Sequence, residues 1–188
     1  MRLTLLIISV AAFLVAGCDQ SNHDVRKAQH INCVNNLKQI GFAFKIWEIN
    51  HGDQYPFNVS TNAGGTMELC AVGKDGFDSN AFLHFKTLIG DDGLRVPLLL
   101  FCPQDRSKKA ATNWDSLGPE NVTYRLHSGT NVNDLHPREI LAVCPVDGNV
   151  LFCDGTVFEK GVKPESKQNP LIFNLMKHQI EIEIEKLK

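Results

Sequence analysis

The six cysteines of this 188-residue chain are the side chains with the widest choice of chemistry. Cys18 follows an apolar leader, and the other five are spread along the chain at Cys33, Cys70, Cys102, Cys144 and Cys153. No pair has the C-x-x-C spacing of thiol-redox motifs, and no histidine lies at zinc-finger spacing from a cysteine, so we predict no metal site. Five is an odd number, which leaves at least one thiol free or paired outside the chain. Cys70, in flexible sequence, is the candidate for that thiol.

The N-terminus has the layout of an export signal. Arg2 is followed by an apolar run over residues 3–16, and residues 15–18 (VAGC) place small side chains directly before a cysteine. The run is shorter than the ~20 apolar residues that a spanning helix needs. These residues resemble the lipobox of bacterial lipoproteins, which implies cleavage before Cys18 and a diacylglyceryl and acyl (palmitate-type) modification of that residue. The alternatives are an ordinary cleaved signal peptide or an uncleaved anchor.

We therefore expect a lipoprotein signal peptide over residues 1–17, a tether over residues 18–24 and one globular domain over residues 25–188. Because each buried methylene contributes ~0.8 kcal/mol, two or three acyl chains hold a protein on a membrane stably. The predicted location is a membrane surface outside the cytoplasm. Asp19, after the lipidated cysteine, resembles a retention signal for the inner membrane. A location on the periplasmic face of the inner membrane is therefore favoured over the outer membrane.

Composition and motifs argue against several function classes. The formal net charge is −2, and the densest basic cluster is residues 106–109, so no nucleic-acid partner is expected. Nucleophile elbows, phosphate loops, dinucleotide fingerprints and zinc-protease helices do not occur in the sequence. Turn formation explains Asp147 and Asp154, each followed by glycine, and a calcium loop is the alternative. We predict no catalytic residue, no cofactor and no enzyme.

Hydrophobic spacing predicts helices near both ends of the domain. Apolar residues recur at three- and four-residue steps from Cys33 to Trp47, which indicates an amphipathic helix over residues 24–50. Residues 51–53 (HGD) end it, and Pro56 prevents its continuation. A short helix is predicted over residues 81–89. Residues 171–187 alternate in places like a strand, but their length and spacing favour a C-terminal helix.

The middle of the chain predicts strands. Residues 96–101 form an apolar run typical of a strand or the approach to one, and residues 121–126 alternate as a strand does. Three strands over residues 140–144, 149–153 and 156–159 are separated by two Asp-Gly pairs, which indicates an antiparallel β-meander. The predicted fold is α+β, with the long helix packed on this meander.

Several motifs in order resemble a known family. They are residues 33–44 (CVNNLKQIGFAF), 51–58 (HGDQYPFN), 64–68 (GGTME), 101–105 (FCPQD) and 121–124 (NVTY). Together, over residues 29–158, they resemble pseudopilin-like proteins of the kind found in Planctomycetes and Verrucomicrobia, relatives of the type II secretion pseudopilins. The resemblance implies a helix-plus-sheet head. Many members carry a histidine separated by nine residues from an Asp-Gly pair; here Asp154 and Gly155 are present and Cys144 takes the place of the histidine.

The resemblance has further implications. Cys33 and Cys102 lie in two of the family-like motifs. A disulfide between them would close a long loop and stabilise the folded state by ~4 kcal/mol; two buried free thiols are the alternative. True pseudopilins begin with a prepilin peptidase site and an apolar helix, whereas this chain has a lipobox. Filament assembly through a helical spine is therefore not implied.

The expected function is that of a lipid-anchored, non-enzymatic, pseudopilin-like envelope protein that acts through protein–protein contacts. Its partners would be the membrane and secretion-apparatus or pilin-like proteins. The alternatives are a lipoprotein that binds a glycan or peptide and an extracytoplasmic hydrolase, both of which need a pocket lined by convergent polar groups.

Overall fold

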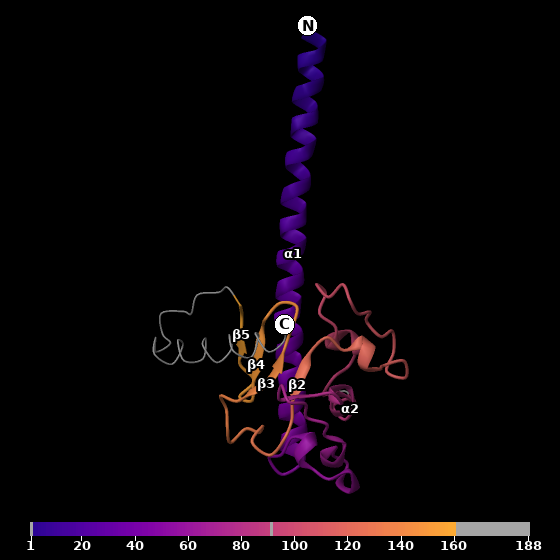
Figure 1. The fold of residues 1–188 in the computed structure, drawn as a ribbon, viewed down its shortest axis with the longest axis vertical. Coiled ribbons are helices and arrows are strands. Elements are labelled where there is room, and N and C mark those ends of the chain that lie inside the picture. Colours follow the sequence, from indigo (N-terminus) through magenta and orange to yellow (C-terminus); the bar gives the residue numbers. More distant parts are fainter. Residues whose placement is uncertain (1, 91, 161–188) are drawn as a thin grey trace.

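The computed structural model describes the backbone of residues 2–90 and 92–160, and the side chains from residue 22 onward. Figure 1 shows one long helix that stands on a compact head of short elements. In chain order the elements are α1 (Arg2–Asn50), η1 (Pro56–Asn58), η2 (Thr61–Ala63), η3 (Met67–Leu69), β1 (Phe77–Asp78), α2 (Ala81–Lys86), η4 (Pro97–Leu100), η5 (Pro119–Asn121), β2 (Arg125–His127), β3 (Ile140–Val143), β4 (Val150–Phe152) and β5 (Val157–Phe158), where η marks a 3₁₀ helix.

Helix α1 is longer than the pattern predicts. We expected it to begin near Asp24, but it runs without interruption from Arg2, so the segment predicted as a tether is helical as well. The apolar period marks only the part of a helix that packs on a core, whereas residues 19–24 are polar and contain no proline or glycine that would stop the helix. The predicted end is confirmed: Gly52 and Asp53 have positive φ, and the N–H groups of His51 and Asp53 bond to the Glu48 carbonyl.

The sheet has five antiparallel strands in the order β1-β2-β3-β4-β5. The predicted meander is confirmed in β3, β4 and β5, and Gly148 and Gly155 take the positive φ that the Asp-Gly turns require. A register irregularity between Ile140 and Ala142 turns both Leu141 and Ala142 toward the main core. A smaller apolar cluster forms separately from that core; its members are Phe77, Ile140, Val143, Val150 and Phe152.

Three predicted elements differ from the structure. The run at residues 96–101 is not a strand but the 3₁₀ helix η4, because Pro97 fixes φ and lacks the N–H that a strand would use. The strand predicted over residues 121–126 is displaced to β2, since Asn121 belongs to η5. Helix α2 is shorter than predicted and ends at Lys86. The predicted C-terminal helix over residues 171–187 lies outside the described residues.

The C-terminal half of α1 packs into the head and forms its core. Helix α1 contacts η1, η4, β4 and β5, and in Figure 1 its lower half runs alongside the sheet while its upper half extends beyond the head. Gly41 permits a close approach here, because a Cβ atom at this position would come within 2.8 Å of Leu151 Cδ1. The α1 residues of the core are Cys33, Leu37, Ile40, Ala43 and Phe44.

Two phenylalanines in the C-terminal half of α1, Phe42 and Phe44, test this packing. Phe44 is fully buried against Tyr55, Phe57 and Phe85, whereas Phe42 is 61% exposed. We expect Phe44→Ala to lower the free energy of unfolding by about 3–5 kcal/mol through lost burial and the cavity left behind. Phe42→Ala should change it by less than about 0.5 kcal/mol. Urea unfolding of both variants measures the difference, and equal losses would contradict this placement of the helix.

Candidate functional site

Three buried thiols meet at the centre of the head. Cys33 belongs to α1, Cys102 follows η4 and Cys144 follows β3. Each is 0% exposed, and their sulfur atoms lie within 4.8 Å of one another. All three are free thiols in the structure. Segments that are far apart in the sequence therefore bring three potential thiolates to one place.

Two turns of the same sequence type each position one of these sulfurs. Cys102 and Cys144 are each followed by proline and, two residues later, by aspartate. In the second turn the N–H of Asp147 donates to Cys144 Sγ at 3.3 Å. In the first turn the N–H groups of Gln104 and Asp105 act on the Cys102 sulfur and help to lower its pKa. Proline sharpens each turn and directs backbone donors back toward the sulfur.

Two side chains donate to the third sulfur. The Asn149 amide nitrogen lies 3.6 Å from Cys33 Sγ, and the Tyr124 hydroxyl lies 3.7 Å from it. Asn149 is itself fully buried, and its Oδ1 accepts the N–H of Lys160 at 3.1 Å. The sulfur of Cys33 is thus hydrogen-bonded inside the core, and the buried amide that donates to it has a partner.

The three thiols share protons unequally. Hydrogen bonds from the Cys144 and Cys33 thiols lower the pKa of Cys102, while donation to Cys102 raises the pKa of both partners. Burial opposes ionisation at each of them.

The structure brings together the two cysteines of the predicted disulfide, Cys33 and Cys102, and adds a third that sequence analysis missed. Because both are free thiols here, the disulfide stays a prediction. Cys144 pairs with Asn149 across its turn and not with Cys153. The repeated Cys-Pro-x-Asp motif at residues 102–105 and 144–147 is the sequence signal that could have found Cys144. The side chain of Cys18 lies outside the described residues.

A second buried cluster surrounds His84 on α2. Its Nε2 lies 3.0 Å from Asp78 Oδ2, and its Nδ1 lies 2.7 Å from the Thr66 hydroxyl. Asp78 also accepts hydrogen bonds from Ser128 and from the N–H groups of Ala71 and Asn80. The network thus ties the loop that carries the GGTME motif to α2 and to the segment after β2.

Burial and hydrogen bonding act in opposite directions in this network. Burial lowers the pKa of His84 and outweighs the effect of the hydrogen bond that His84 donates to Asp78, which would raise this pKa. Burial raises the pKa of Asp78, but the bonds from Ser128, Asn80 and His84 outweigh it, so this pKa is lowered. His84 is therefore neutral: it donates through Nε2 to the Asp78 carboxylate and accepts from Thr66. Cys70 lies within 4.8 Å of both groups and is half-buried.

The remaining sequence candidates have local roles. His51 stacks on Trp47 with ring centroids 3.5 Å apart and closes the end of α1. Asp154 accepts from the N–H and hydroxyl of Thr156 within its own turn. Asp147 Oδ2 lies 3.4 Å from His30 Nδ1. The contacts of Asp154 are those of a turn residue, whereas the Asp147 side chain faces His30 on α1.

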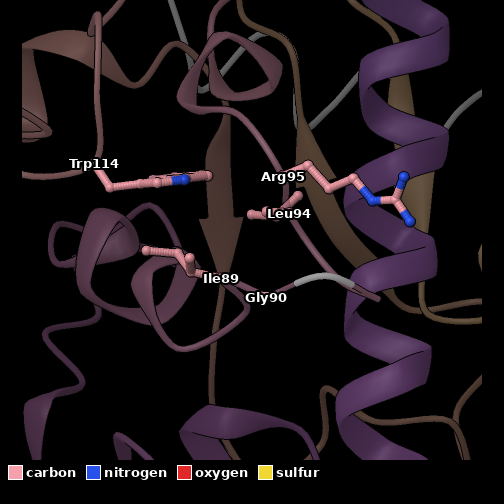
Figure 2. A pocket seen from close by; sticks show the side chains of 5 residues that line it. All are labelled: Ile89, Gly90, Leu94, Arg95 and Trp114. Atoms are coloured by element: carbon pink, nitrogen blue, oxygen red, sulfur yellow. The ribbon is translucent and has the colours of Figure 1, made fainter.

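One hollow opens beside α2 and η4, with a volume of about 520 Å³. Figure 2 shows the side chains of Trp114, Ile89 and Leu94 facing one another, while Arg95 points away from them toward α1. The lining is thus mainly apolar, without the convergent polar groups that a glycan or peptide site needs.

Comparison of the chain with protein-family models, with curated proteins and with solved structures gave no match. The resemblance to pseudopilin-like proteins stays a prediction from the sequence motifs.

The His84 network predicts how stability depends on pH. The unfolded chain binds a proton at His84 as the pH falls through about 6.5, whereas the folded chain keeps it neutral, so acid favours unfolding. For the wild type we expect the free energy of unfolding to fall between pH 7 and pH 5. The contribution of His84 to this slope is at most about 1.4 kcal/mol per pH unit.

Urea titrations at several pH values measure this contribution. His84→Gln should flatten the slope, and His136→Gln, at an exposed histidine, should leave it unchanged. Equal slopes in the wild type and His84→Gln would show that His84 is not held neutral.

Proposed function

We propose that the chain is a lipid-anchored, pseudopilin-like protein of the cell envelope that acts through protein–protein contacts and not through catalysis. The observation that supports this most strongly is helix α1, which packs one half into a mixed helix-and-sheet head and extends the other half beyond it (Figure 1). A helix-plus-sheet head is what the sequence resemblance implies.

The anchor in this proposal is Cys18. Cleavage before it leaves 14 residues between Cys18 and Cys33, which is the first fully buried residue among the α1 side chains that the structure describes. At 1.5 Å per residue, this stretch spans roughly 20 Å as a helix. Residues 22–28 are all exposed, as a stalk between membrane and head requires. Asp19 favours the periplasmic face of the inner membrane.

Within the described part of the chain, no helix combines the length and the apolar character needed to cross a membrane.

The contact surface in this proposal is the outer face of α1. Ile31, Phe42 and Ile49 are exposed there by 48%, 61% and 75%. They are separated by 11 and 7 residues, close to whole numbers of helical turns, so they form one stripe. Large apolar side chains aligned on one helix face suit docking against a partner helix. We expect the partners to be secretion-apparatus or pilin-like subunits.

The buried clusters support a non-enzymatic role. The sulfurs of Cys33, Cys102 and Cys144 and the ring of His84 belong to fully buried residues. A substrate cannot reach these groups without local unfolding of the head. The ionisable groups of the two buried clusters are thus closed to solvent.

Lipidation at Cys18 is tested by metabolic labelling with a palmitate analogue. We expect the wild type to be labelled and to partition with membranes, and Cys18→Ala to lose the label and accumulate with Met1 retained. Cys70→Ala is the control, since it removes a thiol of the head and should remain labelled. An unlabelled wild type whose intact mass retains residue 1 would contradict the lipid anchor.

The outer face of α1 is tested by photo-crosslinking in cells. A photoreactive amino acid in place of Phe42 should give crosslinks to secretion-apparatus or pilin-like subunits. The same amino acid in place of Lys74, an exposed residue of a head loop, should not. Identical products from both positions, or none from Phe42, would count against this contact surface.

A further inference from the structure

The three-thiol cluster carries an inference about metal binding. Its sulfurs approach one another within 4.8 Å without any disulfide, and they come from three separate segments of the fold. We propose that Cys33, Cys102 and Cys144 bind one Cu(I) ion through their three sulfurs.

The first argument is the environment of the sulfurs. Asp147 N–H donates to Cys144 Sγ at 3.3 Å, and the Asn149 amide and the Tyr124 hydroxyl donate to Cys33 Sγ at 3.6 and 3.7 Å. Donors around the sulfurs are the surroundings that metal-bound thiolates use to spread their charge. Cys153 is equally buried in the same core, yet among the described residues no donor contacts its sulfur.

The second argument concerns which ion fits. Thiolate sulfurs are soft ligands and select Cu(I) or Zn(II). Zn(II) takes four ligands, and its fourth would have to be water or another side chain. All three cysteines are closed to solvent, and the groups beside Cys33 Sγ are hydrogen-bond donors. A three-sulfur site of this kind suits the trigonal coordination of Cu(I).

Binding requires no electron transfer. The ion replaces the protons that remain on the thiols, and those protons pass to solvent. The site and a Cys33–Cys102 disulfide exclude each other, because a sulfur in a disulfide is no longer a thiolate. The oxidation state of the three cysteines therefore decides whether the cluster binds the ion or forms the disulfide.

The test uses the full chain, purified from membranes in detergent, reduced and kept free of oxygen. Titration with Cu(I) against the chelator bicinchoninate should show one ion per chain. Cys144→Ser should weaken binding by at least about tenfold. Cys153→Ser, which removes a buried thiol outside the cluster, should bind as the wild type does.

X-ray absorption of the copper-loaded wild type gives a readout that does not depend on a variant that folds. Three sulfur neighbours per copper are expected. The proposal is overturned if the wild type keeps no Cu(I) or prefers Zn(II), if Cys144→Ser binds as tightly as the wild type, or if nitrogen and oxygen surround the copper. A complete Cys33–Cys102 disulfide in protein isolated without reductant would overturn it too. None of these results depends on the lipid anchor or on a partner.

Discussion

The structure depends on the burial of one face of α1 against the rest of the head. The five strands have two to four residues each, too few to form a stable sheet without a covering element. The helix provides this cover, and specific hydrogen bonds fix it in place. Asn36 on α1 donates to the Phe101 carbonyl after η4 at 3.0 Å. The Tyr55 hydroxyl, just after the helix, donates to the Cys153 carbonyl at 2.7 Å.

The two buried polar clusters lie where separate segments of the chain pack against one another. The thiol cluster joins α1 to the ends of η4 and β3. The His84 network joins the loop before β1 to α2 and to the chain after β2. Because an unsatisfied buried polar group costs about 1–3 kcal/mol, each network fixes the segments that supply its partners. The head thus gains defined connections between long irregular segments that secondary structure alone would leave loosely held.

Sequence predicted the elements that depend on local rules. The end of α1 at Gly52 and the Asp-Gly turns of the meander follow from the conformational freedom of glycine. The start of α1 did not follow, because its hydrophobic period begins only where the helix enters the head. The apolar run at η4 resembles a strand until Pro97 is considered. Short apolar runs carry no period that separates helix from strand.

The candidate site was only half predictable. Cys33 and Cys102 were singled out by the motifs in which they lie. The place of Cys144 beside them, and the contacts of His84 with its partners, were not predicted, since tertiary contacts between segments distant in the sequence bring these residues together. Only the repeated proline and aspartate after Cys102 and Cys144 hinted that both belong to one structural feature.

A division of α1 into a packed half and an exposed half underlies both the fold and the proposed function. Hydrogen exchange of the full chain in detergent, followed by mass spectrometry, measures this division most directly. The account predicts that amides of residues 33–48 exchange only through global unfolding, whereas those of residues 22–30 exchange much faster. Uniform protection along the helix, or rapid exchange over residues 33–48, would contradict it.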